Sequence, residues 1–274
     1  MIALDAAEAR SLLAFAEDAA RQAGGILRER FGQTHDVQYK GTIDIVTEAD
    51  KASEALIARL VREAWPGHDL LGEEGARGTG AAAGSPWRWI IDPLDGTTNF
   101  AHHLPTFAVS IGLERDGQPA LGVVYDPMRD ECFAAARGHG ATLNGKPIGV
   151  SPIDELIRSV LVTGFSYDFD RRGRQAHLWR TFLTRVQAIR QTGSAALNLC
   201  YVAAGRMDGY WERGISPWDV AAGAAILLEA GGAITDFAGN PYRSEDRVVL
   251  AANPGIHRAM LACIAEAGEE PPAA

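Results

Sequence analysis

Cysteines, basic residues and long apolar runs are all scarce in this sequence. The three cysteines, Cys132, Cys200 and Cys263, are widely spaced and form no Cys-x-x-Cys pair, which argues against a disulfide framework or a cysteine-rich metal site. We expect them to be reduced thiols in the core of a cytoplasmic protein. No apolar run reaches the 18 or so residues of a membrane span and no signal peptide is visible, so we predict no contact with a membrane.

The balance of charge is acidic. The 274 residues include 26 Lys and Arg against 35 Asp and Glu, which gives a formal net charge of -9. A general nucleic-acid binder or a protein of anionic membrane surfaces needs a basic field, so we expect neither class here. An acidic protein that handles a phosphate needs local positive charge, from a metal ion or from a few placed Lys and Arg side chains.

The order of the predicted elements indicates two lobes. Amphipathic helices are predicted at about 5–31 and 48–65, and a mostly antiparallel sheet follows, with Asp116-Gly117 as a hairpin turn. After about Val150, strands alternate with predicted helices at about 175–186, 195–204, 218–229 and 256–267. We therefore predict an α/β fold, α+β by a strict definition. Its parts are an N-terminal lobe (1–150), a C-terminal lobe (151–268) and a mobile tail (269–274).

The segment "WIIDPLDGTTNF" places two carboxylates at the end of an apolar run. We expect Pro93 to turn the chain after a buried strand, so that Asp92 and Asp95 converge beside the carbonyl of Leu94. Two like charges held so close favour a cation between them, and Mg2+ prefers carboxylate and carbonyl oxygens. An Asp-rich turn that bonds nearby amides is the alternative. The Gly-Thr-Thr that follows favours the metal, because successive amides there can hold an anion such as phosphate.

Other acidic residues could complete such a site, although each has a simpler explanation. Glu73 and Glu74 in "LLGEEG" fit a solvated loop. Asp50 follows Thr47 at the spacing of a helix capping box, and Asp219 in "ISPWDVAAG" falls in the first turn of a helix, where a carboxylate favours the helix dipole. It is their occurrence together in one chain that favours a metal site.

"WIIDPLDGTTNF" and "WDVAAGAAILLEAGG" resemble the two signature segments of the inositol monophosphatase family, which belongs to the lithium-sensitive, Mg2+-dependent phosphatases. The resemblance extends over nearly the whole chain, since "DIVTEAD", "GEEG", "GATLNGKPI" and "TGSAALNLCYVAAGRMDGYWE" fall in the family's order. It implies a layered αβαβα sandwich with two fused lobes. It also implies two or three Mg2+ ions per active site, and a homodimer.

The resemblance implies a role for each matching position. Metal ligands are implied at Glu73, Asp92, the Leu94 carbonyl, Asp95 and Asp219. Catalytic positions that place and activate a water are implied at Glu73, Thr97 and Asp50. Phosphate-binding amides are implied at Gly96 and Thr97, and substrate contacts at Asp95, Gly193, Ser194, Ala195 and Glu212. A mobile loop that closes over the metals is implied at Lys40 and Asp44.

These roles predict a Mg2+-dependent phosphate monoester hydrolase in which a metal-activated water attacks the phosphorus directly. We expect myo-inositol 1-phosphate as substrate, with histidinol phosphate or another sugar or nucleotide phosphate as the alternative. Aspartyl-phosphate phosphatases are a rival class, but Pro93 stands where their nucleophilic Asp would be. A regulatory protein that acts on the transcription machinery is a rival of another kind.

Overall fold

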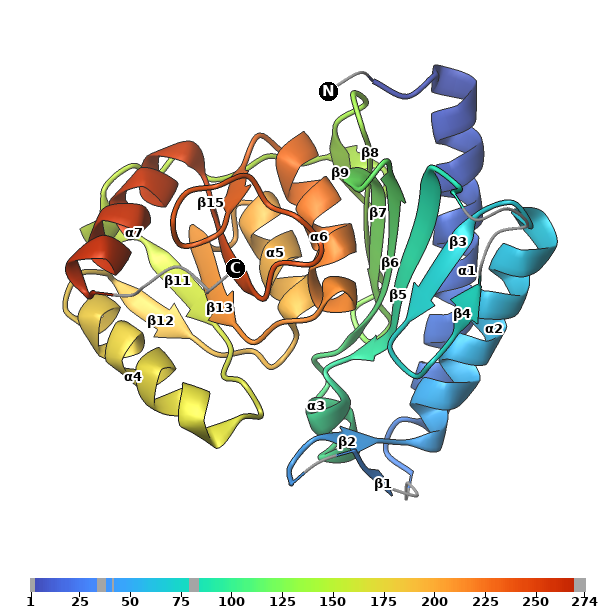
Figure 1. Ribbon diagram of the computed structural model, residues 1–274, viewed down its shortest axis with the longest axis horizontal. Coiled ribbons are helices and arrows are strands. Elements are labelled where there is room, and N and C mark those ends of the chain that lie inside the picture. Colours follow the sequence, from blue (N-terminus) through green and yellow to red (C-terminus); the bar gives the residue numbers. More distant parts are fainter. Residues whose placement is uncertain (1–2, 34–37, 41, 79–83, 269–274) are drawn as a thin grey trace.

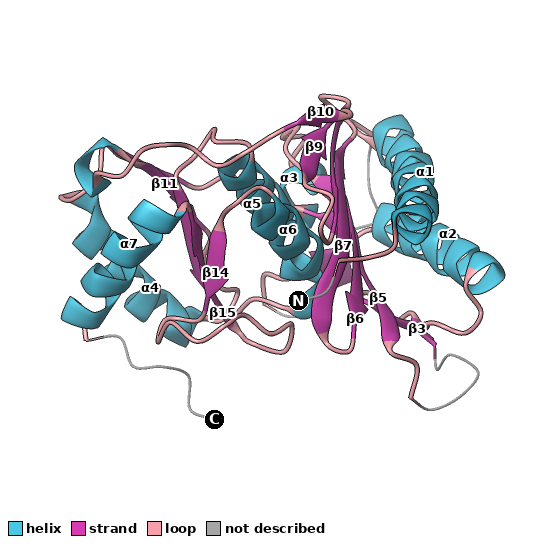
Figure 2. Ribbon diagram, turned by 90° about the horizontal axis from the view of Figure 1, so that it is seen from above, coloured by secondary structure: helices cyan, strands magenta, loops and turns pink. Residues whose placement is uncertain are grey.

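The computed structural model describes residues 3–33, 38–40, 42–78 and 84–268, and it has five layers of helices and sheets (Figures 1 and 2). The predicted αβαβα sandwich is confirmed. From one side to the other, the layers are two helices, an eight-stranded sheet, two helices, a five-stranded sheet and two helices. The tail at 269–274 lies outside the described residues, and the division of the chain at residue 150 stays a prediction.

The first layer consists of α1 (Ala6–Arg30) and α2 (Glu48–Ala64), which pack on the eight-stranded sheet. Asp5 caps α1 by accepting hydrogen bonds from the amides of Ala7 and Glu8. The face of α1 that meets the sheet is built largely of alanine, which lets helix and sheet approach closely. The predicted helix positions are thus confirmed to within two residues at each end.

The eight-stranded sheet has the order β10-β9-β8-β7-β6-β5-β3-β4, and only the β3–β5 pair is parallel. Asp116 and Gly117 connect β6 to β7 with φ of 54° and 70°, as a hairpin turn of the predicted kind requires. The strands are β3 (Asp69–Gly72), β4 (Arg77–Gly78), β5 (Trp87–Asp95), β6 (Ala108–Arg115), β7 (Gln118–Asp126), β8 (Glu131–Ala136), β9 (Ala141–Leu143) and β10 (Lys146–Pro147).

The chain does not leave the sheet at Pro93, where the sequence predicted a turn. β5 continues through Pro93 to Asp95, and its pairing with β6 shifts between Asp92 and Asp95. Two residues of β5 there lie opposite one residue of β6, which is the pattern of a β-bulge. Proline has no amide hydrogen to donate, so it is tolerated where the ladder is already interrupted.

The five-stranded sheet has the order β12-β11-β13-β15-β14, with β11 parallel to both of its neighbours. Helices α5 (Ala195–Ala203) and α6 (Pro217–Glu229) lie between the two sheets, and α4 (Phe169–Leu183) and α7 (Pro254–Glu266) form the last layer. α4 begins six residues before the predicted start. The strands are β11 (Val160–Thr163), β12 (Ala188–Arg190), β13 (Gly209–Arg213), β14 (Ala233–Thr235) and β15 (Val248–Ala252).

Short elements complete the described chain. They are the paired strands β1 (Gln38–Tyr39) and β2 (Ile45–Val46), the one-turn helix α3 (Thr97–Ala101) and a 3-10 turn at Leu156–Arg158. The end of β5, the short α3 and the starts of α5 and α6 meet between the two sheets, where the candidate site lies (Figure 1). Within the described ranges, no helix has the length and apolar character needed to cross a membrane.

Candidate active site

Three carboxylates from distant parts of the chain converge at the end of β5. Asp92, Asp95 and Asp219 each place one oxygen within 4.8 Å of the others. Asp92 and Asp95 lie on either side of the bulge in β5, and Asp219 lies in the first turn of α6. Carboxylate oxygens at this spacing can share a divalent cation.

Hydrogen bonds hold each of these carboxylates in place. Asp92 Oδ1 accepts from the amide of Leu94 at 3.0 Å, and Asp219 Oδ2 accepts from the amide of Ser216 at 2.7 Å as part of a capping box. The second oxygen of each has no hydrogen bond to any described residue. One oxygen therefore positions the side chain while the other remains available to a metal.

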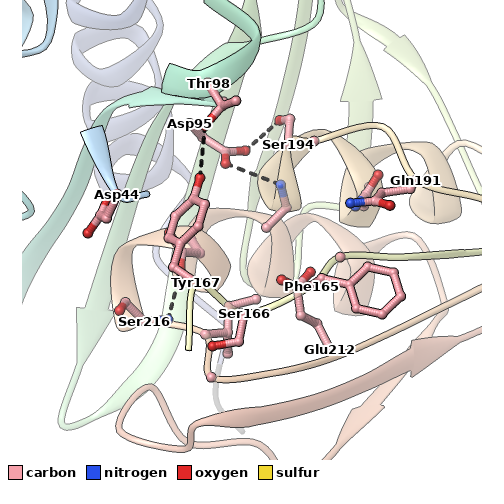
Figure 3. Close-up of a pocket in the computed structure, with 18 of the residues that line it drawn as sticks. Asp44, Asp95, Thr98, Phe165, Ser166, Tyr167, Gln191, Ser194, Glu212 and Ser216 are labelled. Carbon is pink, nitrogen blue, oxygen red and sulfur yellow. Dashed lines mark hydrogen bonds between the residues drawn. The ribbon is translucent and has the colours of Figure 1, made fainter. Parts of the chain in front are cut away.

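Asp95 is held by the start of α5 (Figure 3). It accepts hydrogen bonds from the Ser194 hydroxyl, from the amide of Ala196 at 2.7 Å and from the amide of Ala195 at 3.2 Å. Ser194 and Ala195, which the family resemblance implies as substrate contacts, therefore contact a carboxylate of the cluster in this structure. Gly193 lines the pocket beside them.

The cluster is electrostatically unfavourable without a cation. Burial, followed by the charges of Glu73 and Asp95, raises the pKa of Asp92 well above its usual range. Burial and the charges of Asp95 and Glu73 do the same to the pKa of Asp219. Burial raises the pKa of Asp95 to about 6 although its hydrogen bonds oppose the shift. A divalent cation would remove this repulsion, so the donor set fits Mg2+.

Glu73 is paired with a lysine. Lys40 Nζ lies 2.9 Å from Glu73 Oε1 and also binds Glu74. Burial raises the pKa of Glu73 to about 7, and the charge of Lys40 opposes this. Glu73 is close enough for its charge to act on Asp92 and Asp219, but it is outside the set of three converging carboxylates in the described chain. The positive charge of Lys40 thus lies beside Glu73, which the resemblance implies as a metal ligand.

Replacing Lys40 by methionine tests whether Lys40 and Mg2+ compete for Glu73. We expect the metal-free protein to lose on the order of 1–2 kcal/mol, less than for a fully buried ion pair, because Glu73 then lies near Asp92 and Asp219 without a cation. The rise in melting temperature on adding Mg2+ should be larger than in the wild type. Lys51→Met is the control, since Lys51 donates only to Gln38 in the described chain. An equal rise in melting temperature on adding Mg2+ to the wild type, Lys40→Met and Lys51→Met would contradict a competition between Lys40 and Mg2+ for Glu73.

Thr97 and Asp50 are joined by a hydrogen bond. Thr97 Oγ1 lies 3.0 Å from Asp50 Oδ1 and 3.1 Å from the Leu94 carbonyl oxygen, and it can donate its proton to either. Asp50 Oδ2 accepts from the amide and hydroxyl of Thr47, which completes the capping box of α2. Of the implied group Glu73, Thr97 and Asp50, the structure links the last two directly.

Gly96 forms the tight turn between β5 and α3 at the site. It has φ of 105°, in the left-handed region, and an added Cβ would lie 3.1 Å from the Thr106 carbonyl oxygen and 3.2 Å from that of Gly193. Glycine is therefore the residue that fits here. The turn brings Gly96 to the pocket beside the carboxylate cluster, and Thr97 follows it at the start of α3.

A pocket of about 650 Å³ extends from the cluster toward the C-terminal lobe. Glu212, on β13, is half-buried in its wall and accepts a hydrogen bond from the Tyr210 hydroxyl at 2.7 Å. Burial raises the pKa of Glu212 to about 7. Asp44 lies on the opposite side, and both appear in Figure 3. The volume is typical of small-molecule sites.

The segment after β11 supplies pocket residues that the sequence reasoning missed. Tyr167 extends across the pocket, and its hydroxyl lies 3.3 Å from Thr98 Oγ1 on α3 (Figure 3). Phe165 and Arg172 also line the pocket. No motif marked these residues, because their place depends on how the loop before α4 packs against the other lobe.

Comparisons with known proteins agree with this geometry. The inositol monophosphatase family profile matches residues 8–270. The chain is 44% identical to the inositol-1-monophosphatase of Synechocystis over 92% of this chain and 88% of the relative. It is 41% identical to the Nus factor SuhB of Pseudomonas aeruginosa over 92% and 95% of the two chains.

Solved structures give the same result. The inositol monophosphatase of Anabaena superposes with a TM-score of 0.84 at 43% identity, covering 94% of this chain and 96% of that one. The suppressor protein SuhB of Bartonella henselae superposes with a TM-score of 0.89 at 38% identity, covering 93% and 98%. With this match over nearly its full length, the chain belongs to the inositol monophosphatase family.

Proposed function

We propose that this protein is a Mg2+-dependent phosphate monoester hydrolase whose first substrate is myo-inositol 1-phosphate. The observation that carries the proposal is the convergence of Asp92, Asp95 and Asp219, with raised pKa values, beside the Gly96 turn. Membership of the family and similarity to named inositol monophosphatases support the same activity. Asp92, Asp95, Asp219, Glu73 and the Leu94 carbonyl are the proposed metal ligands.

Bound Mg2+ supplies positive charge that neutralises the phosphate oxygens, acidifies water and stabilises the leaving oxygen. The amides of Gly96 and Thr97 would hold the phosphate beside it. The proton of the attacking water would pass to Thr97 Oγ1 as Thr97 gives its own proton to Asp50 Oδ1, along the observed 3.0 Å hydrogen bond. Glu73, with a pKa of about 7, is the second candidate to accept this proton near neutral pH.

The wall of the pocket supports a polyol as the leaving group. The half-buried carboxylate of Glu212 can accept hydrogen bonds from sugar or inositol hydroxyls, and a charged amine such as that of histidinol phosphate is its alternative partner. The leaving oxygen must regain a proton, which solvent can supply once the bond to phosphorus breaks.

Phosphate release tests the proposal. With Mg2+ we expect turnover of myo-inositol 1-phosphate above that of histidinol phosphate, with inhibition by lithium and loss of activity in EDTA. Undiminished turnover in EDTA would contradict the metal site. A strong preference for histidinol phosphate would contradict the substrate, and a trapped phospho-aspartate would contradict direct attack by water.

The resemblance further supports two or three Mg2+ ions per site, a homodimer, and a loop at Lys40 and Asp44 that closes over the metals. The three free cysteines favour a cytoplasmic location. Sedimentation of the purified protein tests the dimer. The similarity to the Nus factor SuhB of P. aeruginosa favours a second candidate function, an action on the transcription machinery. Specific binding of Asp92→Asn protein to RNA polymerase would support that function. The absence of such binding would contradict it and leave catalysis as the single proposed function.

A further inference from the structure

The pocket contains one basic side chain whose role the proposed reaction leaves open. Among the described lining residues, Arg172 is the only Lys or Arg, whereas carboxylates are supplied by Asp44, Glu73, Asp95, Glu212 and Asp219. Arg172 nevertheless forms no ion pair with any of these carboxylates in the described chain. A cation that shares a cavity with acids and pairs with none of them is available to a ligand.

Contacts with Ser166 and Phe169 orient the guanidinium group of Arg172 and use only one of its nitrogens. Its Nε donates to the Ser166 carbonyl oxygen at 2.8 Å, and its Cζ lies 4.9 Å from the centre of the Phe169 ring. Gln175, also on α4, accepts from the Ser166 amide at 2.9 Å, so the loop and the helix support each other. The terminal nitrogens of Arg172 have no hydrogen-bond partner in the described part of the chain.

This arrangement matches the way arginine binds anions. The two terminal nitrogens of a guanidinium form a planar fork that fits the oxygens of a carboxylate or a phosphate. Ordering by Ser166 and Phe169 lowers the conformational cost of using that fork. A neutral polyol end would gain little from it, because hydroxyl groups already have an acceptor in Glu212.

We propose that Arg172 binds a second anionic group on the substrate, a carboxylate or a second phosphate, at the end of the molecule that is not hydrolysed. The inference rests on the proposed function, since it assumes that the scissile phosphate lies at the Asp92, Asp95 and Asp219 cluster. The substrates then include, beside myo-inositol 1-phosphate, phosphomonoesters of sugar-sized polyols that carry a further negative charge and bind more tightly than their uncharged open-chain counterparts. Arg172 is thus a specificity-determining residue that leaves the chemical step unchanged.

A matched set of six-carbon substrates tests this directly. Sorbitol 6-phosphate, 6-phosphogluconate and sorbitol 1,6-bisphosphate share one chain and differ at the far end, which is a hydroxyl, a carboxylate or a phosphate. We expect the KM of wild-type protein to be about tenfold or more lower for at least one of the two compounds with an anionic far end than for sorbitol 6-phosphate. The better of the two identifies the group. In Arg172→Gln that advantage should vanish, while kcat and the KM for sorbitol 6-phosphate stay near wild type.

Arg174→Gln is the matched control, because Arg174 lies on the same helix, is exposed and does not line the pocket. Arg172→Lys should restore part of the advantage, since it keeps the charge but loses the fork. Melting temperatures check that the variants fold. Equal KM values for the three substrates in wild type, or an equal change for all three in Arg172→Gln, would overturn the proposal.

Equilibrium binding separates this proposal from the proposed function. Calorimetry with Ca2+ in place of Mg2+ measures the dissociation constants of the same three compounds without relying on turnover. A tighter dissociation constant that depends on Arg172, without any phosphate release under Mg2+, would support the anion site and contradict the hydrolase. Phosphate release from all three, with dissociation constants unaffected by Arg172, would support the hydrolase and contradict the anion site.

Discussion

Replacing Asp92 by asparagine is expected to reduce activity by at least about 100-fold and, at the same time, to make the metal-free protein more stable. The loss of activity follows because Asp92 is central to the proposed metal site. Mutation of a residue that only hydrogen-bonds to a metal ligand already lowers metal affinity or activity by roughly 10–100-fold. Phosphate release from myo-inositol 1-phosphate with Mg2+ measures it.

The gain in stability follows from the sign of the pKa shift. Burial and the neighbouring charges raise the pKa of Asp92 well above 3.8. A carboxyl whose pKa is higher in the folded than in the unfolded state stabilises the fold at low pH, and that contribution is lost as the pH rises toward neutral. Asparagine carries no charge, so the cost at neutral pH disappears. For a chain of this size, each kcal/mol recovered raises the melting temperature by roughly 2–4 °C.

The matched control is Asp126→Asn, because Asp126 is equally buried but satisfied. It accepts from the amides of Met128 and Arg129 and pairs with the Arg129 guanidinium at 2.7 Å. We expect this variant to melt lower than wild type and to keep the wild-type response to Mg2+. Asp92→Asn should melt higher without metal and respond little to Mg2+. A lower melting temperature for metal-free Asp92→Asn would show that the charge of Asp92 does not destabilise the metal-free protein through repulsion by the neighbouring carboxylates.

Replacing Gly122 by alanine is expected to give the largest loss of stability. Gly122 on β7 pairs with Gly112 on β6, and both face α6. A Cβ at Gly122 would lie 2.1 Å from the carbonyl oxygen of Ala222, which is backbone and cannot rotate away. We expect a loss of about 3 kcal/mol, at the upper end of the cost of overpacking. The melting temperature should fall by roughly 6–12 °C.

The same substitution should also reduce activity, because α6 carries Asp219 to the cluster and must shift to admit the methyl group. Gly25→Ala on α1 is the control, since nothing lies within 4 Å of its added Cβ. Alanine in a helix should stabilise that variant by up to about 1 kcal/mol. If Gly122→Ala melted within about a degree of wild type, the close packing of α6 on the sheet would be refuted.

Much of the fold was predictable because short-range chemistry decides it. Hydrophobic periodicity and capping residues located α1, α2 and α6, and the Asp-Gly turn located one hairpin. α4 was placed too late, since its sequence is polar and contains Gly173, so that its start has no periodic signal. Several strands of two or three residues, such as β14, were missed because pairing with longer neighbours rather than their own sequence makes them strands.

Two of the open alternatives at the site were not exclusive. Asp50 caps α2 with one oxygen and binds Thr97 with the other, and Asp219 caps α6 while its second oxygen remains available at the cluster. The sequence presented capping and metal binding as rival explanations. A carboxylate has two oxygens, so one side chain can do both.

The sequence by itself determined the acidic motifs, the caps that orient them and the family to which the chain belongs, because these depend on residues that are neighbours along the chain or match a known pattern. Only the tertiary structure decided that Lys40 pairs with Glu73, that Tyr167 reaches Thr98 across the pocket and that Arg172 is the lone basic residue described in its wall. These contacts join segments more than 30 residues apart or depend on the packing of one lobe against the other, and no local pattern encodes such distances.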